Sequence, residues 1–138
     1  MYKKTIKYED YNGVERTEDH YFYLSEAELM KMEMSINGGL AEMIQRIVAA
    51  QDAPAIVEIF DEMISKSYGQ KSLDGKRFIK VDENGRRLFD EFKQTEAYSQ
   101  LFMELASNAD EAAKFVNGIM PAKLSERAKA ELPITQIK

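Results

Sequence analysis

The stretch that decides the fold is residues 2–29, which read YKKTIKYEDYNGVERTEDHYFYLSEAEL. Its first half alternates as a strand does, with aromatic and apolar side chains on one face: Tyr2, Ile6 and Tyr8. Asn12-Gly13 follows, and both residues tolerate the positive φ of a two-residue type I′ turn. Beyond the turn the chain returns as a second strand, with Phe22 and Leu24 on one face. The pattern predicts a β-hairpin over residues 2–24.

A helix is predicted directly after the hairpin. Ser25 is a good N-cap, and Glu28 three residues later can satisfy its backbone N–H in return, as in a capping box. Leu24 and Leu29 have the spacing of a hydrophobic staple around that cap. We expect this helix to run to about Ser35, before the Gly38-Gly39 pair breaks it.

Apolar residues at helical spacing continue through most of the remaining chain. They predict helices over 40–50, from Asp52 to Gly69, from Leu88 to a break at Thr95, from Thr95 to Leu105, from Asn108 to Gly118, and over 123–131. Residues 70–87 are less regular and predict a loop with one short strand near Phe78. The predicted fold is α+β, an N-terminal β-hairpin followed by five to seven short amphipathic helices. We expect one domain over 1–138, with a hairpin (1–24), a helical body (25–121) and a weakly ordered C-terminal segment (122–138).

Composition excludes several function classes. The chain of 138 residues has no cysteine and one histidine, His20, so neither a disulfide nor a two-histidine metal site can form within it. It contains no apolar run of the ~20 residues that cross a bilayer, and no secretory signal is expected. Phosphate-binding and nucleophile-elbow motifs are absent, and the net charge is −5. These features predict a cytoplasmic, non-enzymatic protein without cofactor, metal or membrane.

Three groups of polar residues are weighed against ordinary structural roles. Glu58, Asp61 and Glu62 could act as acids or bind metal, but their positions predict the solvated side of a helix. Glu91 and Lys93, with Asp74 or Asp82, match a short nuclease pattern that requires strands, whereas Glu91 is predicted helical. His20 is predicted to be a surface residue of the second strand.

The segment 71–87 supports an alternative function. It carries a cluster of cations next to aromatic residues: Lys71, Lys76, Arg77, Lys80, Arg86 and Arg87, around Phe78 and Phe89. Cations on phosphate and aromatic rings on bases are how proteins contact nucleic acid. A small phage or host regulator that contacts nucleic acid through this loop is therefore the alternative, although acidic residues dilute the cluster.

Methionine is the compositional oddity, with eight in the chain. Met30, Met34 and Met43 flank the Gly38-Gly39 break, whereas Met32 lies on the predicted buried stripe. Methionine adapts to irregular apolar surfaces, and glycine makes a helix junction deformable. We expect Met30, Met34 and Met43 to bind a partner.

Four strings carry a family resemblance: YNGVERTED (11–19), GGLAEMIQRIVAAQD (38–52), QTEAYSQLFMEL (94–105) and FVNGIMP (115–121). With them the chain resembles the tail assembly chaperones of long-tailed bacteriophages and prophages of Gram-positive bacteria. The resemblance covers about residues 2–121 and fades at 82–88. It implies a protein that binds the helical tape measure protein and keeps it soluble in the host cytoplasm while the tail tube assembles. It implies absence from the mature virion.

The hairpin also predicts self-association. A two-stranded sheet with aromatic residues on both faces exposes an edge on which another chain can pair. The side chains expected to take part are Tyr2, Ile6, Tyr8 and Phe22.

Overall fold

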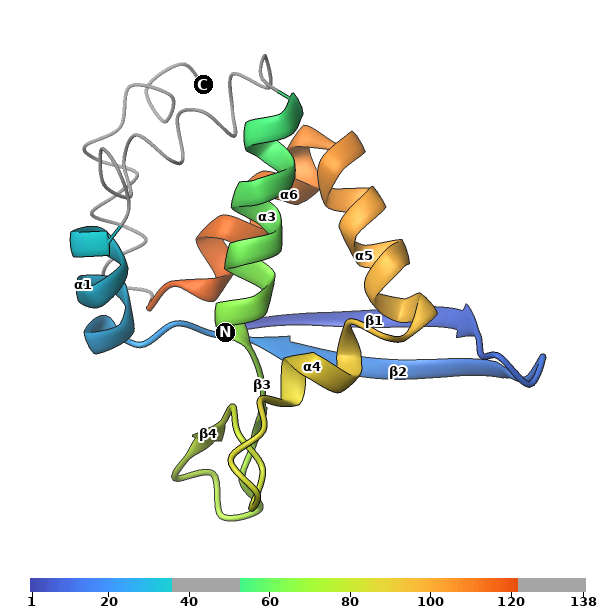
Figure 1. Cartoon of the computed structure of the whole chain (residues 1–138), viewed down its shortest axis with the longest axis horizontal. Helices are drawn as coiled ribbons and strands as arrows, with labels where there is room; N and C mark the ends of the chain where they lie inside the picture. Colours follow the sequence, from blue (N-terminus) through green and yellow to red (C-terminus); the bar gives the residue numbers. More distant parts are fainter. Residues whose placement is uncertain (36–52, 122–138) are drawn as a thin grey trace.

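A computed structural model describes residues 1–35 and 53–121 of the chain. The helix predicted over 40–50, the Gly38-Gly39 break and the segment 122–138 lie outside the described residues. Over the described part the predicted α+β fold is confirmed, with an N-terminal antiparallel hairpin followed by helices (Figure 1). The extent of the domain over 1–138 stays a prediction.

The hairpin consists of β1 (Tyr2–Glu9) and β2 (Glu15–Phe22), which pair from Tyr2↔Phe22 to Glu9↔Glu15. The predicted two-residue turn is wrong. Gly13 N–H donates to the Asp10 carbonyl and Asp10 N–H to the Val14 carbonyl, so the connection is one residue longer. Gly13 has a φ of 78°, as does the left-handed residue that follows the turn in a three-residue hairpin connection. The Asp10 carboxylate accepts hydrogen bonds from the backbone N–H groups of Asn12 and Val14, and these bonds stabilise the longer turn.

Over residues 1–35 and 53–121 the sheet has four strands, because β3 (Tyr68–Lys71) and β4 (Phe78–Ile79) extend it in the order β1-β2-β3-β4. Phe22 pairs with Tyr68, and Lys71 pairs with Phe78. The short strand near Phe78 was predicted, but β3 was not. Gly69 does not end the preceding helix, since it is a buried residue of β3 packed under the Phe78 ring.

Five helices follow the hairpin in the described residues. They are α1 (Glu26–Ser35), α3 (Ala53–Ser67), α4 (Leu88–Phe92), α5 (Glu96–Ser107) and α6 (Ala109–Ile119). The predicted capping box is confirmed, with Glu28 N–H donating to the Ser25 hydroxyl and Ser25 N–H to the Glu28 carboxylate. Thr95 and Asn108, at which the sequence predicts helices to begin, are the N-caps of α5 and α6, and their side chains accept backbone N–H groups of the first turn. Gly118 does not end α6; it leaves space for Tyr2, since a Cβ there would lie 2.9 Å from the Tyr2 ring.

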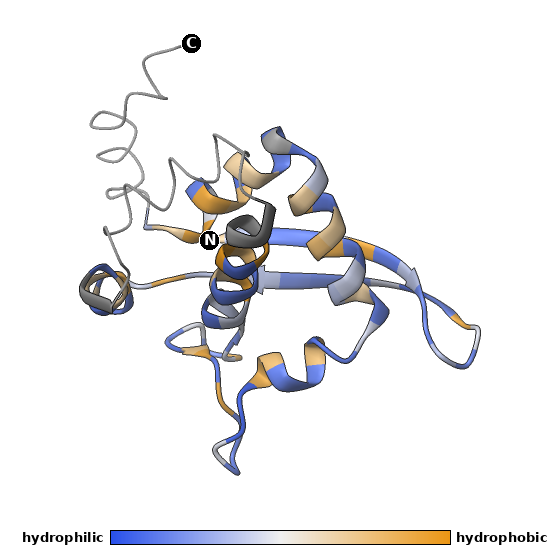
Figure 2. Ribbon diagram, turned by 45° about the horizontal axis from the view of Figure 1, so that its top comes forward, coloured by the Kyte–Doolittle hydropathy of each residue, from blue (hydrophilic) through white to orange (hydrophobic). Residues whose placement is uncertain are grey.

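The core lies between one face of the sheet and the helices above it, with α3, α5 and α6 on the same side (Figures 1 and 2). Phe22 is completely buried and forms its centre, with its ring 5.5 Å from those of Tyr68 and Phe115. Lys4 connects the edge strand β1 to two helices. Its ammonium group donates a hydrogen bond to Glu104 of α5 and lies 3.8 Å from Glu111 of α6. The opposite face of β1 is polar and exposed.

Candidate functional site: apolar surfaces on the helices

The predicted partner-binding methionines are only partly placed by the structure. Met30 of α1 is 69% exposed, whereas Met32 is buried, so the predicted division between surface and core holds for this pair. The side chain of Met34 and the whole of Met43 lie outside the described residues. Met30 is therefore an apolar side chain on the solvent side of a helix, which is what a docking residue requires.

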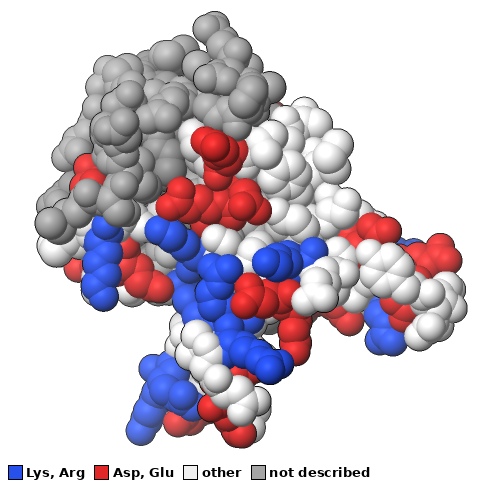
Figure 3. All heavy atoms as spheres, viewed as in Figure 1, with Lys and Arg blue, Asp and Glu red and all other residues white. Residues whose placement is uncertain are grey.

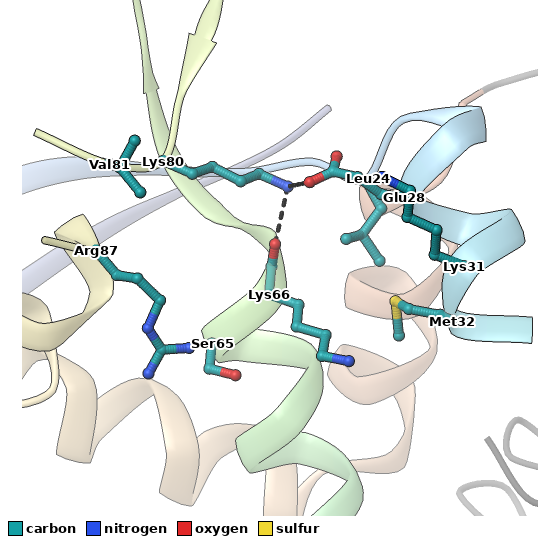
Figure 4. A pocket seen from close by; sticks show the side chains of 9 residues that line it. All are labelled: Leu24, Glu28, Lys31, Met32, Ser65, Lys66, Lys80, Val81 and Arg87. Carbon is teal, nitrogen blue, oxygen red and sulfur yellow. Dashed lines mark hydrogen bonds and ion pairs between the residues drawn. The ribbon is translucent and has the colours of Figure 1, made fainter. Parts of the chain in front are cut away.

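A pocket of about 410 Å³ lies next to α1, between the end of α3 and the start of α4 (Figure 4). Leu24, Met32 and Val81 give it apolar walls. Its remaining lining residues are mostly charged: Glu28, Lys31, Ser65, Lys66, Lys80 and Arg87. The pocket is thus an apolar hollow with a rim of cations.

Lys80 crosses the pocket and links three segments. Its Nζ donates to Glu28 Oε2 at 2.6 Å and to the Lys66 carbonyl at 2.8 Å (Figure 4). Burial would raise the pKa of Glu28, but the hydrogen bond and charge of Lys80 together with the hydrogen bonds from Ser25 outweigh it, and the pKa is lowered. Burial lowers the pKa of Lys80, and Glu28 only partly opposes this. A half-buried pair of this kind fixes geometry more than it adds stability, so Lys80 positions α1 against the β4 segment.

A second hollow, of about 530 Å³, lies between α3 and α5. We call it the α3–α5 groove. Its apolar lining comes from Val57, Phe102, Met103 and Tyr11, of which Val57 is 47% and Met103 60% exposed. Its polar lining comes from Glu58, Asp61, Lys93, Thr95, Glu96, Tyr98 and Ser99.

The aromatic residues of α5 have two roles. The spacing of the apolar residues in 94–105 predicts that Tyr98, Leu101, Phe102 and Leu105 face inward. The two leucines are buried, and Tyr98 and Phe102 are partly buried against the core while they also line the groove. The Tyr98 hydroxyl donates to Asp61 at 2.9 Å, and burial together with this carboxylate raises the pKa of Tyr98. Val57 does not lie on the face of α3 that buries Ile59, Phe60 and Met63. An apolar residue away from the buried face of its helix is the feature of the sequence that could have indicated this groove.

The cations of the 71–87 loop do not form one free surface. Lys80 is bound to Glu28, Arg87 lies 3.2 Å from Asp90, and Lys71 stacks over the Tyr21 ring. The remaining cations, on the exposed turns of this loop, are Lys76, Arg77 and Arg86. Phe89 is buried and cannot stack on a base. Blue side chains gather over this region in Figure 3, with acidic groups between them.

The acidic residues considered for catalysis have structural roles or lie on the surface. Asp74 and Asp82 each accept backbone N–H groups within their own turns. Glu58, Asp61 and Glu62 are exposed on α3, as predicted. Over residues 1–35 and 53–121, no group of histidine and carboxylate side chains is arranged to hold a metal ion.

The prediction that His20 is a surface residue is wrong. Its side chain is only 11% exposed, because its ring lies 4.7 Å from that of Phe92 and Nδ1 is 3.3 Å from the Tyr68 hydroxyl. The missed strand β3 brings Tyr68 over it. Burial lowers the pKa of His20, and Glu18 at 3.6 Å only partly offsets this.

The four hairpin residues expected in self-association lie in the core of the chain itself. Phe22, Ile6 and Tyr8 are buried, and Tyr2 packs edge-on against Phe115 at 5.2 Å. Their side chains are therefore not a free docking surface in this conformation. What the hairpin leaves open, among the described residues, is the backbone edge of β1.

None of the described helices is both long and apolar enough to span a membrane. No curated protein and no solved structure matches the chain significantly. A family model described as phage tail assembly chaperone matches residues 1–137, nearly the entire sequence. This agrees with the family inferred from the four sequence strings. The chain belongs to the phage tail assembly chaperone family.

Proposed function

We propose that this protein binds the tape measure protein of its phage and keeps it soluble while the tail tube assembles. The observation that carries the proposal is the exposure of Met30, an adaptable apolar side chain, on the solvent side of α1. A tape measure protein presents apolar helix stripes until the tube covers them, and such stripes dock by helix-in-groove packing. Membership of the chaperone family supports the same function.

The mode of action is non-covalent and needs no cofactor. A chaperone that must leave when tube subunits arrive requires weak contacts repeated along the client rather than one tight interface. We accordingly place the protein in the host cytoplasm during assembly and outside the mature virion.

Co-expression with the tape measure protein tests this function. In the double variant Met30→Lys, Met34→Lys, we expect the chaperone to stay folded while the client moves to the insoluble fraction. Leu73→Lys is the matched control, because Leu73 is a fully exposed apolar residue on the remote β3–β4 turn. A folded double variant that keeps the client as soluble as the wild type does would place the binding surface elsewhere.

We also propose self-association by antiparallel pairing of two β1 edges. The edge is open over the described residues, and pairing would bring the exposed Lys3 and Lys7 of two chains close together. Lys3 lies 3.6 Å from Asp19 and Lys7 lies 2.6 Å from Glu15, so these ion pairs offset part of the repulsion between the lysines, and we expect only a weak dependence of the association on salt. Sedimentation velocity at increasing salt measures it, and a monomer at every protein and salt concentration would contradict it.

A further inference from the structure

The α3–α5 groove combines exposed apolar area with an uncompensated charge. The two helices lie next to each other on the sheet in both ribbon views (Figures 1 and 2), and Val57 of α3 and Met103 of α5 are both largely exposed. Phe102 adds a partly buried ring to the lining of the groove. Exposed apolar residues from two neighbouring helices are what a third helix needs in order to pack its own apolar stripe.

The charges of the groove are predominantly acidic. Glu58 and Asp61 of α3 and Glu96 of α5 line it, and none of the three pairs with a cation among the described residues. The one lining cation, Lys93, already lies 3.8 Å from Asp90. Figure 3 shows acidic side chains over α3, bordered by uncharged atoms over α5. The groove therefore favours a cationic partner and disfavours an acidic one.

We propose that the α3–α5 groove binds a basic amphipathic helix of a partner protein. Its apolar stripe packs on Val57, Phe102 and Met103, while lysine or arginine residues flanking the stripe reach Glu58 and Glu96. The length is suitable, because the 12 residues of α5 extend over about 18 Å, some three turns of a docked helix. This deepens the proposed function, since it assigns a surface and a charge to the helical client, but it rests on different residues from Met30.

The test uses the full-length protein and two synthetic peptides of about 18 residues, long enough for five helical turns. Both carry leucines at helical spacing; one has lysines flanking the stripe and the other has glutamates. Fluorescence anisotropy should show binding of the lysine peptide that weakens between about 50 and about 300 mM salt. The glutamate peptide should bind about tenfold less tightly or not at all.

Two sets of variants locate the binding. Val57→Lys with Met103→Lys should weaken binding of the lysine peptide about tenfold or more, by removing the apolar contact and by adding like charge to the groove. Glu58→Gln with Glu96→Gln changes only exposed charge and should weaken it about threefold to tenfold, even if the first pair disturbs folding. Leu73→Lys is the matched control, because Leu73 is an exposed apolar residue on the β3–β4 turn outside the groove, and it should leave peptide affinity unchanged.

Equal binding of both peptides, or unchanged affinity in the folded Gln pair, would overturn the proposal. An equal loss in Leu73→Lys would overturn it too, because the loss would then not be specific to the groove. Failure here is distinguishable from failure of the proposed function. In the first case the tape measure protein stays soluble with the groove variants, and in the second it aggregates even with the wild type.

Discussion

Replacing Gly69 with alanine should destabilise the protein, and the sign of the effect is diagnostic. A Cβ at this position would lie 2.5 Å from Cε2 of Phe78 and 2.7 Å from the backbone carbonyl oxygen of Ile79. The Phe78 ring can rotate, but the Ile79 carbonyl belongs to β4, so the strand itself must move. Overpacking of this kind costs about 1–3 kcal/mol. At an unobstructed strand position the same change would instead stabilise by about 0.5–1 kcal/mol.

Urea unfolding followed by circular dichroism measures the difference in the free energy of unfolding. Gln70→Ala is the control, because Gln70 is the next residue of β3 and is exposed; we expect a change within about 0.5 kcal/mol. A Gly69→Ala protein as stable as the wild type, or more stable, would refute the close approach of Gly69 to Phe78 and Ile79 of β4. It would also undermine the placement of Lys80, which follows β4 directly and reaches Glu28.

Three further outcomes are expected from the same unfolding assay. Phe22→Ala should cost about 3–5 kcal/mol, because it removes a fully buried ring from the centre of the core, and a cost below about 1 kcal/mol would contradict that position. Ser25→Ala should cost about 1 kcal/mol through loss of the α1 cap, and no loss would show that the capping box is not formed in solution. Burial lowers the pKa of His20 below its usual value of 6.5, so the folded protein binds a proton at this ring less readily than the unfolded chain does. The contribution of the neutral, buried ring to the free energy of unfolding is therefore complete above pH 6.5 and is lost as the pH falls. Stability measured at about pH 7.5 and about pH 5.5 should fall more in the wild type than in His20→Phe, and equal falls would contradict the burial.

Local patterns were sufficient to predict the hairpin and most helix starts. The alternation in β1 and the side-chain caps at Ser25, Thr95 and Asn108 act within a few residues, so the sequence displays them directly. The strand β3 could not be predicted in the same way. Its Tyr-Gly-Gln-Lys sequence has low strand propensity, and its pairing with Phe22 of β2 depends on a contact between residues more than 40 positions apart.

The candidate surfaces likewise differ in whether local sequence patterns could predict them. The exposure of Met30 followed from helical periodicity, since it lies off the stripe that buries Met32. The α3–α5 groove arises only when Val57 and Met103 are brought together by the packing of two helices. The burial of His20 likewise depends on Tyr68 and Phe92, which the tertiary structure supplies.

The most direct test of the chaperone function uses the purified tape measure protein, diluted from denaturant into buffer while light scattering is recorded. We expect the wild-type chaperone to suppress aggregation in proportion to its concentration. We expect Met30→Lys with Met34→Lys to suppress it less, and Leu73→Lys to act as the wild type does. Aggregation that proceeds equally with the wild type and with an unrelated acidic protein of the same size would contradict the proposal that this protein solubilises the tape measure protein.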